Sequence, residues 1–403
     1  MWNEENKTTA LYLVGIGMGS KASLTVEVQE LLERCDCIVG AKRIIESLGA
    51  FKKPVFCAYK PDEILAFVKA NPQYRRIVVA LSGDVGFYSG AKLLREALKE
   101  YVAGTFPGIS SVAYLAAKLG IAWEDAALVS AHGRTQNFIH TIAHSEKTFL
   151  LLGGEDCGRM LGEKLRYYGL SDVEVTLGSR LSYEDEWIQK KSGGQLCEED
   201  GAGLSAAFIY NPHADRSVCR HIEDEEFLRG KVPMTKSEVR ALVLAKLHLT
   251  EDAVLYDVGA GTGSVAVEAA CQSGTIKVYA VERNPEGIGL IHKNKQKFGC
   301  DWIEVIEGAA PDALVPLEAP THVFIGGSGG RLREILKLVK AKNPAVRIVI
   351  TAISLETMGE VMEAVKEGLL LEPEVVQIQA SRSKRLGDYH MMTAQNPVYL
   401  ITE

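Results

Sequence analysis

The sequence lacks the features that would assign it to a membrane or to an oxidising compartment. No apolar stretch approaches the roughly 20 residues that span a bilayer, and the first residues show no basic start followed by an apolar run, as a signal peptide would. The eight cysteines are scattered, and their one close pair, Cys35 and Cys37, matches neither a CxxC redox motif nor half of a zinc site. These absences predict a cytoplasmic protein with reduced thiols, no metal site and no membrane partner.

Positive charge is also scarce. Lys and Arg number 45 against 52 Asp and Glu, which gives a formal net charge of −7. No basic stripe interleaved with aromatic residues runs along the chain, so nucleic-acid binding is disfavoured. The length of 403 residues and the hydrophobic fraction of 47% are typical of a globular protein with more than one domain.

Apolar strand-like runs alternate with helical patterns through most of the chain, which predicts α/β layers with largely parallel sheets. Between residues 183 and 224 the segments become polar, glycine-rich and charged, which predicts loops and a linker, except that "LSAAFIYNP" is predicted to be the last strand of the first domain. The alternation then restarts with five strand-like runs: "AVLYDVGAG", "KVYAVE", "WIEVIEG", "HVFIGG" and "RIVITAI". We therefore predict domains at residues 1–212 and 227–403, joined by a linker at 213–226.

The C-terminal stretch contains two strand-like runs, "PEVVQIQ" and "PVYLITE", with no helical pattern between them. Two neighbouring strands without a crossover helix must pair antiparallel. The second domain is therefore predicted to be a mostly parallel sheet that ends in an antiparallel hairpin. The intervening "ASRSKRLGDYH" is predicted to be a loop that could overhang a cleft.

The stretch "LYDVGAGTGSVAVEAA" ends a predicted strand in GxGxG, formed by Gly259, Gly261 and Gly263. Glycine permits a sharp turn and a close approach of a ligand to the backbone. The dinucleotide fingerprint needs a third glycine where Ser264 stands, so a cofactor without phosphates, such as S-adenosylmethionine, is favoured over a pyrophosphate cofactor. Glu282 lies at the offset expected for a carboxylate on ribose hydroxyls. Asp257, which ends the strand, either takes part in this site or caps the turn.

Ordered motifs in the second half add a family resemblance. "VPMTKSEVRALVLAKL", "DVGAGTGSVAVEAA", "VERNPEGI", "IEGAAP", "VFIGGSGG" and "VITAISLET" resemble the decarboxylating precorrin methyltransferases that act at carbon 15 of the ring in cobalamin biosynthesis. The resemblance runs from about residue 227 to the end. It implies a Rossmann-like class I methyltransferase domain in which the following residues contact S-adenosylmethionine: Thr235, Gly259, Ala260, Gly261, Thr262, Gly263, Glu282 and Ala309.

A second glycine loop lies in "LYLVGIGMGS", where Gly15, Gly17 and Gly19 close the first predicted strand. Together with "ALSGDVGFYSGAKLL" and "FPGISSVAYLAAKLGIAWEDAALVSAHGR", it resembles the tetrapyrrole methylases, in particular the cobalamin-pathway member that methylates carbon 5, over residues 11–210. That family is a class III methyltransferase fold of two α/β subdomains with the cofactor in the cleft between them. The resemblance places the following residues in or near that cleft: Gly15, Gly17, Gly83, Asp84, Val85, Ser110, Ser111, Leu152 and Gly153.

Three details of this first half stay open at the level of the sequence. Val85 stands where the family usually has proline, so the turn should be less rigid. Asp84 either lines the cleft or caps the next helix, as Ser110 or Ser111 also could. His132 and Arg134, on a predicted loop, are candidates for a general base or for binding a carboxylate, with packing or capping as the alternative for His132.

The two resemblances together imply two S-adenosylmethionine sites per chain and a tetrapyrrole methylated at carbons 5 and 15, carbon 15 first, with decarboxylation. Relatives of the second domain suggest a homotetramer formed through that domain. The many carboxylates of such a substrate suit arginine, and a solvated basic surface is the alternative. The candidates for substrate binding are Lys236, Arg240, Gly327, Ser328, Arg331, Arg382 and Arg385.

Three other functions are weighed against this interpretation. An S-adenosylmethionine-dependent methyltransferase acting on RNA or protein would share the fold, but the acidic composition disfavours RNA. A nicotinamide-dependent oxidoreductase would need the GxGxxG spacing, which Ser264 and Ser20 interrupt. A nucleotide-sensing module without catalysis would not need two complete cofactor sites.

Overall fold

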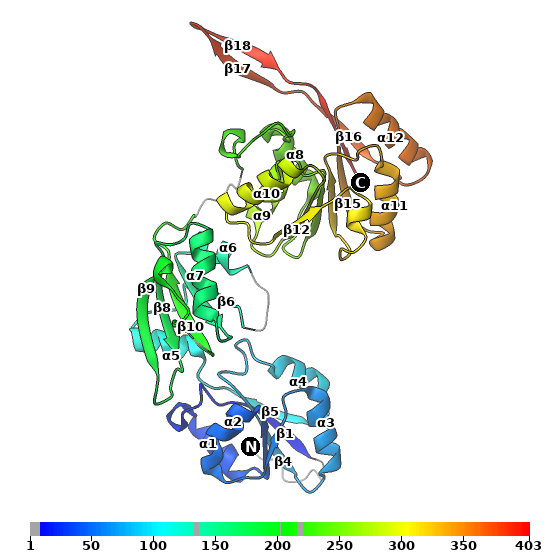
Figure 1. The fold of residues 1–403 in the computed structure, drawn as a ribbon. Helices are drawn as coiled ribbons and strands as arrows, with labels where there is room; N and C mark the ends of the chain where they lie inside the picture. Colours follow the sequence, from blue (N-terminus) through cyan, green and yellow to red (C-terminus); the bar gives the residue numbers. More distant parts are fainter. Residues whose placement is uncertain (1–8, 133–136, 202, 216–220) are drawn as a thin grey trace. The chain divides into compact units, whose positions relative to one another are not determined.

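The computed structural model describes residues 9–132, 137–201, 203–215 and 221–403 (Figure 1). The chain forms two compact units. The first unit consists of Met1–Arg134, Glu146–Glu163 and Ser171–Pro212, and the second of Thr135–Ser145, Lys164–Leu170 and His213–Glu403. The domain limits that we predicted from the sequence stay a prediction.

The first sheet of unit one has five parallel strands in the order β3-β2-β4-β1-β5. These strands are β1 (Ala10–Gly15), β2 (Cys37–Gly40), β3 (Val55–Cys57), β4 (Arg76–Leu81) and β5 (Val102–Phe106). Alternate residues of β1 face opposite sides: Tyr12 and Val14 pack with α1 (Val26–Arg34) and α2 (Lys42–Ser47), whereas Leu11 and Leu13 pack with α3 (Pro61–Ala70) and α4 (Ala91–Ala97). Because the strands are parallel, the loops that follow them meet at one edge of the sheet.

The second sheet of unit one is mostly antiparallel, in the order β6-β7-β10-β8-β9. Its strands are β6 (Ala127–Ser130), β7 (Lys147–Leu152), β8 (Glu174–Ser179), β9 (Trp187–Ser192) and β10 (Ser205–Tyr210), and only β6 and β7 pair in parallel. Helix α5 (Ser111–Leu119) belongs to unit one, α6 (Phe138–His144) belongs to unit two, and α7 (Cys157–Tyr167) is divided between the two units after Glu163.

Two expectations fail in this second sheet. Largely parallel sheets were expected throughout, and β9 falls in the region that the sequence predicts to be loop. The sequence of β9, "WIQKKS", is polar because it is a half-buried edge strand, so it shows no apolar run.

The sheet of unit two has seven strands in the order β13-β12-β11-β14-β15-β19-β16. These strands are β11 (Val254–Val258), β12 (Lys277–Glu282), β13 (Ile303–Glu307), β14 (His322–Ile325), β15 (Arg347–Ala352), β16 (Glu374–Ile378) and β19 (Val398–Thr402). The first five, all parallel, confirm the five strand-like runs of the sequence. Strand β19 pairs antiparallel with β15 and with β16, which confirms the predicted hairpin partners.

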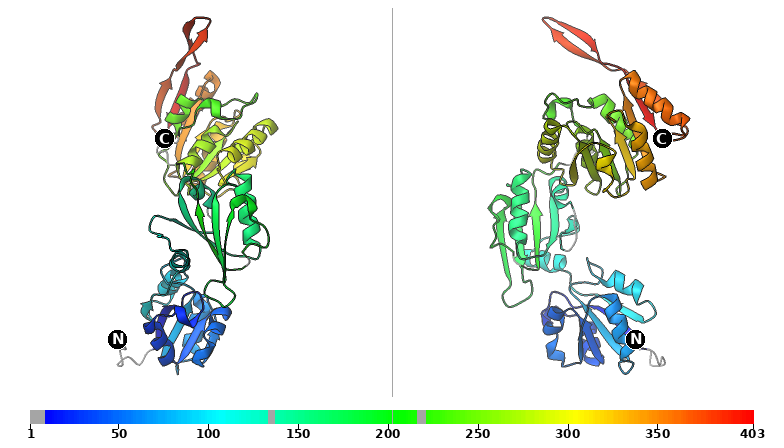
Figure 2. Two further views of the ribbon diagram at one scale, coloured as in Figure 1. Left: turned by 90° about the vertical axis from the view of Figure 1, so that its left-hand side faces the viewer. Right: turned by 45° about the vertical axis from the view of Figure 1, so that its right-hand side comes forward.

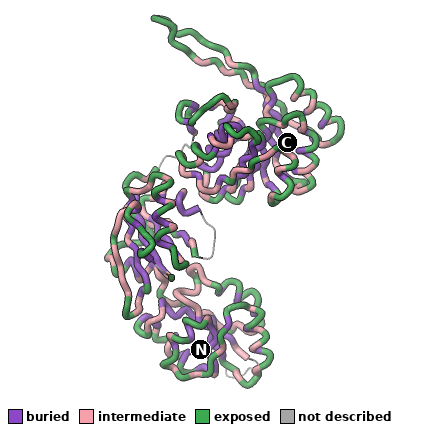
Figure 3. The backbone as a smooth tube through the Cα atoms, in the orientation of Figure 1, coloured by how far each residue is buried: buried purple, intermediate pink, exposed green. Residues whose placement is uncertain are grey.

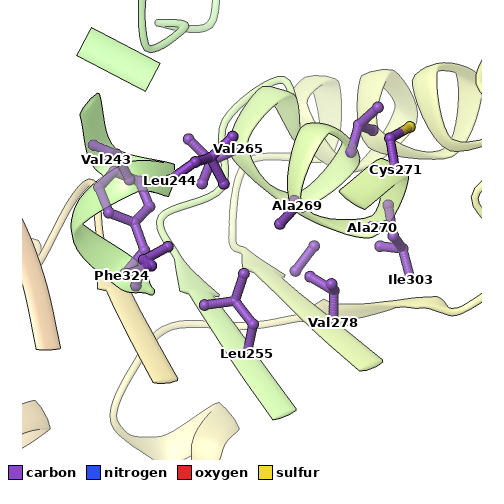
Figure 4. Packing of buried hydrophobic residues seen from close by; sticks show 14 of the residues in the cluster. Val243, Leu244, Leu255, Val265, Ala269, Ala270, Cys271, Val278, Ile303 and Phe324 are labelled. Carbon is purple, nitrogen blue, oxygen red and sulfur yellow. The ribbon is translucent and has the colours of Figure 1, made fainter. Parts of the chain in front are cut away.

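Helices cover both faces of this sheet (Figure 2). On one face lie α8 (Ser237–Leu247), α9 (Ser264–Gln272) and α10 (Pro285–Lys297), and on the other lie α11 (Leu332–Lys342) and α12 (Leu355–Lys366). Figure 4 shows the first of these layers, where Val243 of α8 and Ala269 of α9 pack with Leu255, Val278 and Phe324 of the strands. The alternation of apolar residues in β11, with Leu255 on one face and Tyr256 on the other, explains how one strand serves both layers.

The segment between β16 and β19 differs from the expected loop. It forms a two-stranded antiparallel ribbon, β17 (Ser381–Leu386) and β18 (Tyr389–Ala394). Nearly all of its residues are exposed (Figure 3). The sequence "SRSKRLGDYHMM" has no apolar/polar alternation because neither face of the ribbon is buried within this chain, so the pattern of a strand is missing.

Several observations concern only the described residues. No helix among them has the length and apolarity needed to cross a membrane. The described cysteines, which exclude Cys219, are free thiols. No cluster of three or more His, Cys, Asp or Glu side chains suited to a metal ion occurs in this part of the chain.

Candidate functional site

In unit one, three loops at the carboxyl edge of the first sheet meet backbone to backbone. Gly17 and Gly83 exchange two hydrogen bonds, with N···O distances of 3.1 and 2.7 Å. A Cβ on Gly15 would lie 2.7 Å from the nitrogen of Gly108 and 2.7 Å from the oxygen of Gly83. Since any side chain at Gly15 or Gly108 would overlap neighbouring backbone, glycine is required here for close approach.

Asp84 and Ser110 act locally in these loops. The Oδ1 atom of Asp84 accepts the N–H of Gly108 at 3.1 Å, and its Oδ2 atom accepts the N–H of Gly86 at 2.7 Å. Ser110 caps α5 by accepting the N–H of Ala113 at 3.4 Å. The carboxylate of Asp84 therefore ties the loop after β4 to the loop after β5, rather than capping α4.

A cavity of about 760 Å³ opens beside these loops, within unit one. It contains residues from both sheets of the unit, including Gly83, Ser111 and His132 of those predicted from the sequence. The predicted residues that do not line it are Gly15, Gly17, Asp84, Val85, Ser110, Leu152 and Gly153. Gly17 and Asp84 instead hydrogen-bond to Gly83 and Gly108 in the loops beside the cavity.

His132 lies two residues after the end of β6, a strand of the second sheet, and lines the cavity. The imidazole lies so close to Gly153 that a Cβ at that position would overlap Nδ1. The position after β7 therefore requires glycine, because a side chain at Gly153 would overlap the imidazole of His132. Arg134, the other candidate in this loop, lies outside the described residues.

Sequence reasoning missed a set of polar residues around the same cavity. Arg43 donates from Nη1 to the hydroxyl of Tyr183 at 2.8 Å and from Nη2 to Ser82 Oγ at 3.1 Å. Tyr88, Arg180 and Ser182 hold positive φ angles of 46°, 50° and 71°, which are uncommon for residues other than glycine. Tyr88 and Arg180 line the cavity, and such strain clusters at binding sites. Ser82 and Tyr88 lie within the quoted motif "ALSGDVGFYSGAKLL" but were not singled out, whereas no motif marks Arg43, Arg180, Ser182 or Tyr183.

In unit two, the glycine loop after β11 has the geometry that its sequence predicts. Gly259, Gly261 and Gly263 all have positive φ, at 72°, 58° and 76°. A Cβ on Gly259 would lie 2.8–2.9 Å from backbone atoms of Gly327, and one on Gly261 would lie 2.5 Å from the oxygen of Pro233. The loop is therefore pressed between the chain before α8 and the glycine-rich loop after β14.

Glu282, at the end of β12, holds this loop in place. Its Oε2 atom accepts the N–H of Gly261 at 2.8 Å, and its Oε1 atom accepts the N–H groups of Arg283 and Asn284, each at 2.8 Å. A carboxylate has about four lone-pair sites. The three backbone bonds thus leave acceptor capacity on a side chain that borders a cavity.

Asp257 is buried beneath the same loop. Its Oδ2 atom accepts the N–H of Ala266 in the first turn of α9 at 3.0 Å. Burial raises the pKa of its carboxyl to about 7. Among the described residues, neither its Oδ1 atom nor the buried Oγ1 of Thr262 has a hydrogen-bond partner. Asp257 therefore supports the start of α9 from below and does not line the cavity.

A cavity of about 350 Å³ lies over the carboxyl ends of the parallel strands in unit two. It brings together seven residues predicted from the sequence: Gly259, Gly261, Glu282, Ala309, Gly327, Ser328 and Arg331. The lining also includes Arg283 and Asn284, which directly follow Glu282 in the quoted motif "VERNPEGI" but were not singled out. The remaining predicted cofactor residues, Thr235, Ala260, Thr262 and Gly263, do not line it.

The structure corrects the expectation that Arg240 binds substrate. Its side chain is fully buried, with Nε 2.5 Å from Glu268 Oε2 and Nη1 3.2 Å from Asp224 Oδ1. Its Nη1 atom also donates to the carbonyl of Thr235 at 2.7 Å. Arg240 therefore fastens the segment before α8 to α9, and the guanidinium has no surface to offer a substrate.

The other predicted cations have different surroundings. Arg331 pairs with Asp312 and Glu334, each at 2.6 Å. Arg382, on β17, pairs with Glu238 at 2.7 Å, and Arg385 donates to the carbonyl of Gly387 at 3.0 Å within the ribbon. Lys236 precedes α8 and does not line the cavity. Of these four residues, only Arg331 borders the cavity, and a substrate role for all four stays a prediction.

Comparisons with known proteins divide the chain in the same way as its motifs. Residues 226–402 match the family model of the precorrin methyltransferase domain. Residues 10–197 match the family model of the tetrapyrrole (corrin/porphyrin) methylases.

Relatives of known name agree with these matches. A probable cobalt-precorrin-6B C(15)-methyltransferase (decarboxylating) of Pyrobaculum calidifontis is 44% identical over 184 residues, which cover 45% of this chain and 94% of that protein. A precorrin-6Y C(5,15)-methyltransferase [decarboxylating] of Sinorhizobium sp is 27% identical over 411 aligned positions, which cover 98% of this chain and 95% of that protein. A crystal structure of a precorrin-6Y C5,15-methyltransferase from Geobacter metallireducens, 39% identical, covers 45% of this chain and 94% of its own, with a TM-score of 0.43. The chain therefore belongs to the precorrin methyltransferase family, and along its full length it is a homologue of the precorrin-6Y C(5,15)-methyltransferase (decarboxylating).

Proposed function

We propose that this chain methylates a precorrin ring at carbons 5 and 15 and removes carbon dioxide from a ring acetate in cobalamin biosynthesis, converting precorrin-6B or its cobalt form to the corresponding precorrin-8. The observation that carries the proposal is that each half of the chain has its own glycine-bounded cavity and its own family match, while one relative covering 98% of the chain is named for both positions. The first cavity would serve carbon 5, and the second carbon 15 and the decarboxylation.

The residues around the second cavity fit S-adenosylmethionine as the methyl donor. The three positive-φ glycines bare the backbone of the turn, and the carboxylate of Glu282 keeps lone pairs for ribose hydroxyls. The volume of about 350 Å³ lies in the range of small-molecule sites. When bound, the donor supplies a methyl group already activated by its sulfonium. We place a second donor in the larger cavity of unit one, beside Gly83 and Ser111.

Methyl transfer to the ring depends mainly on how the protein positions the ring carbon against the methyl donor. The bridging carbons of a reduced tetrapyrrole are enamine-like and act as nucleophiles themselves, so the protein has to hold one of them in line with the methyl group and exclude water. Methylation at carbon 15 leaves an electron-poor ring, which accepts the electron pair released when the acetate loses carbon dioxide. The backbone of the glycine loops and the buried support of Asp257 supply a rigid frame for this alignment.

The proposal is tested by counting sites and products. Titration of the full chain with S-adenosylhomocysteine in a calorimeter should give about two sites per chain, and mass spectrometry of the product from precorrin-6B should show two added methyl groups and one lost carbon dioxide. Binding of one equivalent only, or binding of NAD instead, would contradict the assignment of two methyl-transfer sites. Methylation of RNA or protein with no reaction on precorrin would favour the alternative methyltransferase.

We also propose a homo-oligomer, a tetramer formed through the C-terminal domain in the cytoplasm. An isolated two-stranded ribbon is at best marginally stable in water, yet the β17–β18 ribbon exposes large apolar side chains: Leu386, Tyr389, Met391 and Met392. Contact between copies would cover them. Sedimentation of the full chain should show about four copies, and a Met391→Lys, Met392→Lys double variant should sediment as smaller species; a monomeric wild-type chain would refute the proposal.

A further inference from the structure

Arg283 directly follows Glu282 at the end of β12 and lines the cavity of unit two. Its side chain is exposed, while its backbone N–H donates to Glu282 Oε1 at 2.8 Å. The residue is thus anchored beside the carboxylate that holds the glycine loop. We propose that Arg283 binds a carboxylate of the tetrapyrrole during reaction at carbon 15, an inference that rests on the proposed function.

The charge of Arg283 is available, unlike that of the other arginine in the cavity. Arg331 is neutralised by Asp312 and Glu334. Arg283 makes no ion pair with any residue in the ranges that the structure describes. A guanidinium without a carboxylate partner, at the mouth of a cavity, is suited to take one from a ligand.

The guanidinium lies next to the glycine-rich loop after β14. Its Nη1 atom is 3.7 Å from the position that a Cβ on Gly329 would occupy. Gly329 has a φ of 59°, the adjacent Gly330 also lacks a side chain, and the hydroxyl of the preceding Ser328 donates to Glu360 at 3.0 Å. This loop therefore leaves the guanidinium uncovered on the side where a flat ring could approach.

The charges of the two ligands favour the tetrapyrrole over the methyl donor as the partner of Arg283. S-adenosylmethionine carries a sulfonium and an ammonium cation beside its single carboxylate, so a nearby unpaired guanidinium gains little from it. A precorrin is a polyanion with carboxylates around its rim. Binding one of them with the planar fork of arginine would fix the orientation of the ring as well as its affinity.

The experiment compares Arg283→Ala and Arg283→Lys with Arg333→Ala in the full chain. Arg333 is an exposed arginine on α11 that pairs with Glu367 and does not line the cavity, so it is a matched control. We would measure KM and kcat for carbon-15 methylation of precorrin-6B by mass spectrometry, and the affinity for S-adenosylhomocysteine by calorimetry. Arg283→Ala should raise KM about tenfold, the order for one charged hydrogen-bonded contact. Arg283→Lys should give a smaller rise, and Arg333→Ala none.

The outcomes separate this inference from the proposed function. An unchanged KM in Arg283→Ala, with an active wild-type chain, would overturn the role of Arg283 alone. A loss of S-adenosylhomocysteine affinity as large as the rise in KM would assign the residue to the donor and also overturn it. A wild-type chain that methylates no precorrin would overturn the proposed function together with the inference.

Discussion

The glycine loop after β1 packs against the loops after β4 and β5 of its own sheet, whereas the glycine loop after β11 packs between the chain before α8 and the loop after β14 and is held by a carboxylate of the neighbouring strand β12. In the first case the backbones of Gly15, Gly83 and Gly108 contact one another directly, and the carboxylate of Asp84 ties the loops after β4 and β5 together. In the second, Glu282 accepts the N–H of Gly261 and ties the turn to β12. The two similar glycine motifs in the sequence therefore form two different loop structures.

The difference extends to the cavities. The cavity of unit one, about 760 Å³, has walls from two sheets, whereas the cavity of unit two, about 350 Å³, lies at the edge of a single sheet. A site between two sheets draws its residues from distant parts of the chain, as Arg43 and Tyr183 show. A site at one sheet edge draws them from the ends of successive strands, which a sequence displays in order.

The largest expected effect would test whether the two sites are separate. Gly261→Arg should abolish carbon-15 methylation and decarboxylation, because φ is 58° and even a Cβ would lie 2.5 Å from the oxygen of Pro233. Carbon-5 methylation of an already decarboxylated substrate should persist. Mass spectrometry of the products checks both reactions, with the same change at the exposed, unobstructed Gly359 as the control. Loss of both activities in a folded variant would show that the sites are not independent.

A reciprocal change addresses the first site. Gly108→Ala places a methyl group against the backbone of Gly15 and Gly83, and overpacking of this kind costs about 1–3 kcal/mol. We expect carbon-5 methylation to fall at least about tenfold while carbon-15 methylation is retained. Gly49→Ala, where the added methyl meets open space, is the control. Equal activity of the two variants at carbon 5 would mean that the contact of the three loops does not shape the site.

The buried carboxyl of Asp257 should make the stability of unit two depend on pH. Burial raises the pKa of Asp257 to about 7, above the value of about 3.9 in an unfolded chain. Between these values the folded state binds more protons than the unfolded state, so this group's contribution to stability falls as the pH rises from about 4 to about 7. Asp257→Asn removes that dependence.

The stability of Asp257→Asn relative to wild type should therefore increase across this pH window, by an amount on the order of 4 kcal/mol, since one pKa unit corresponds to about 1.4 kcal/mol. Calorimetric melting at several pH values measures the difference. Asp388→Asn, in the exposed turn of the ribbon, should show no comparable trend. A constant difference between Asp257→Asn and wild type would mean that the carboxyl is ionised throughout.

The smallest effect concerns the ribbon, which unit one lacks. Arg382 pairs with Glu238 at 2.7 Å in a partly exposed setting, so Arg382→Ala should cost less than about 1 kcal/mol of unfolding free energy. We expect it to weaken tetrapyrrole binding more than donor binding, by a few-fold at most, as judged by KM and by calorimetry with S-adenosylhomocysteine. Equal weakening of both would assign Arg382 a structural role only.

The sequence by itself determined the parts of this protein that depend on short-range patterns. The five parallel strands of unit two and the positions of both glycine loops follow from apolar periodicity and from the steric freedom of glycine. Glu282 was placed correctly at the cavity because the ends of neighbouring parallel strands meet at the same edge. The motifs in the sequence also indicate the family.

The tertiary structure alone decided what depends on partners distant in the chain. Nothing in the sequence distinguishes Arg240 from a surface arginine, but in the structure its side chain is buried and forms ion pairs with Asp224 and Glu268. Strand β9 and the β17–β18 ribbon lack an apolar face and so lack a periodic signal. Arg43 of α2 and Tyr183 are 140 residues apart in the chain and meet only in the folded protein, because long-range packing sets the surroundings of a side chain.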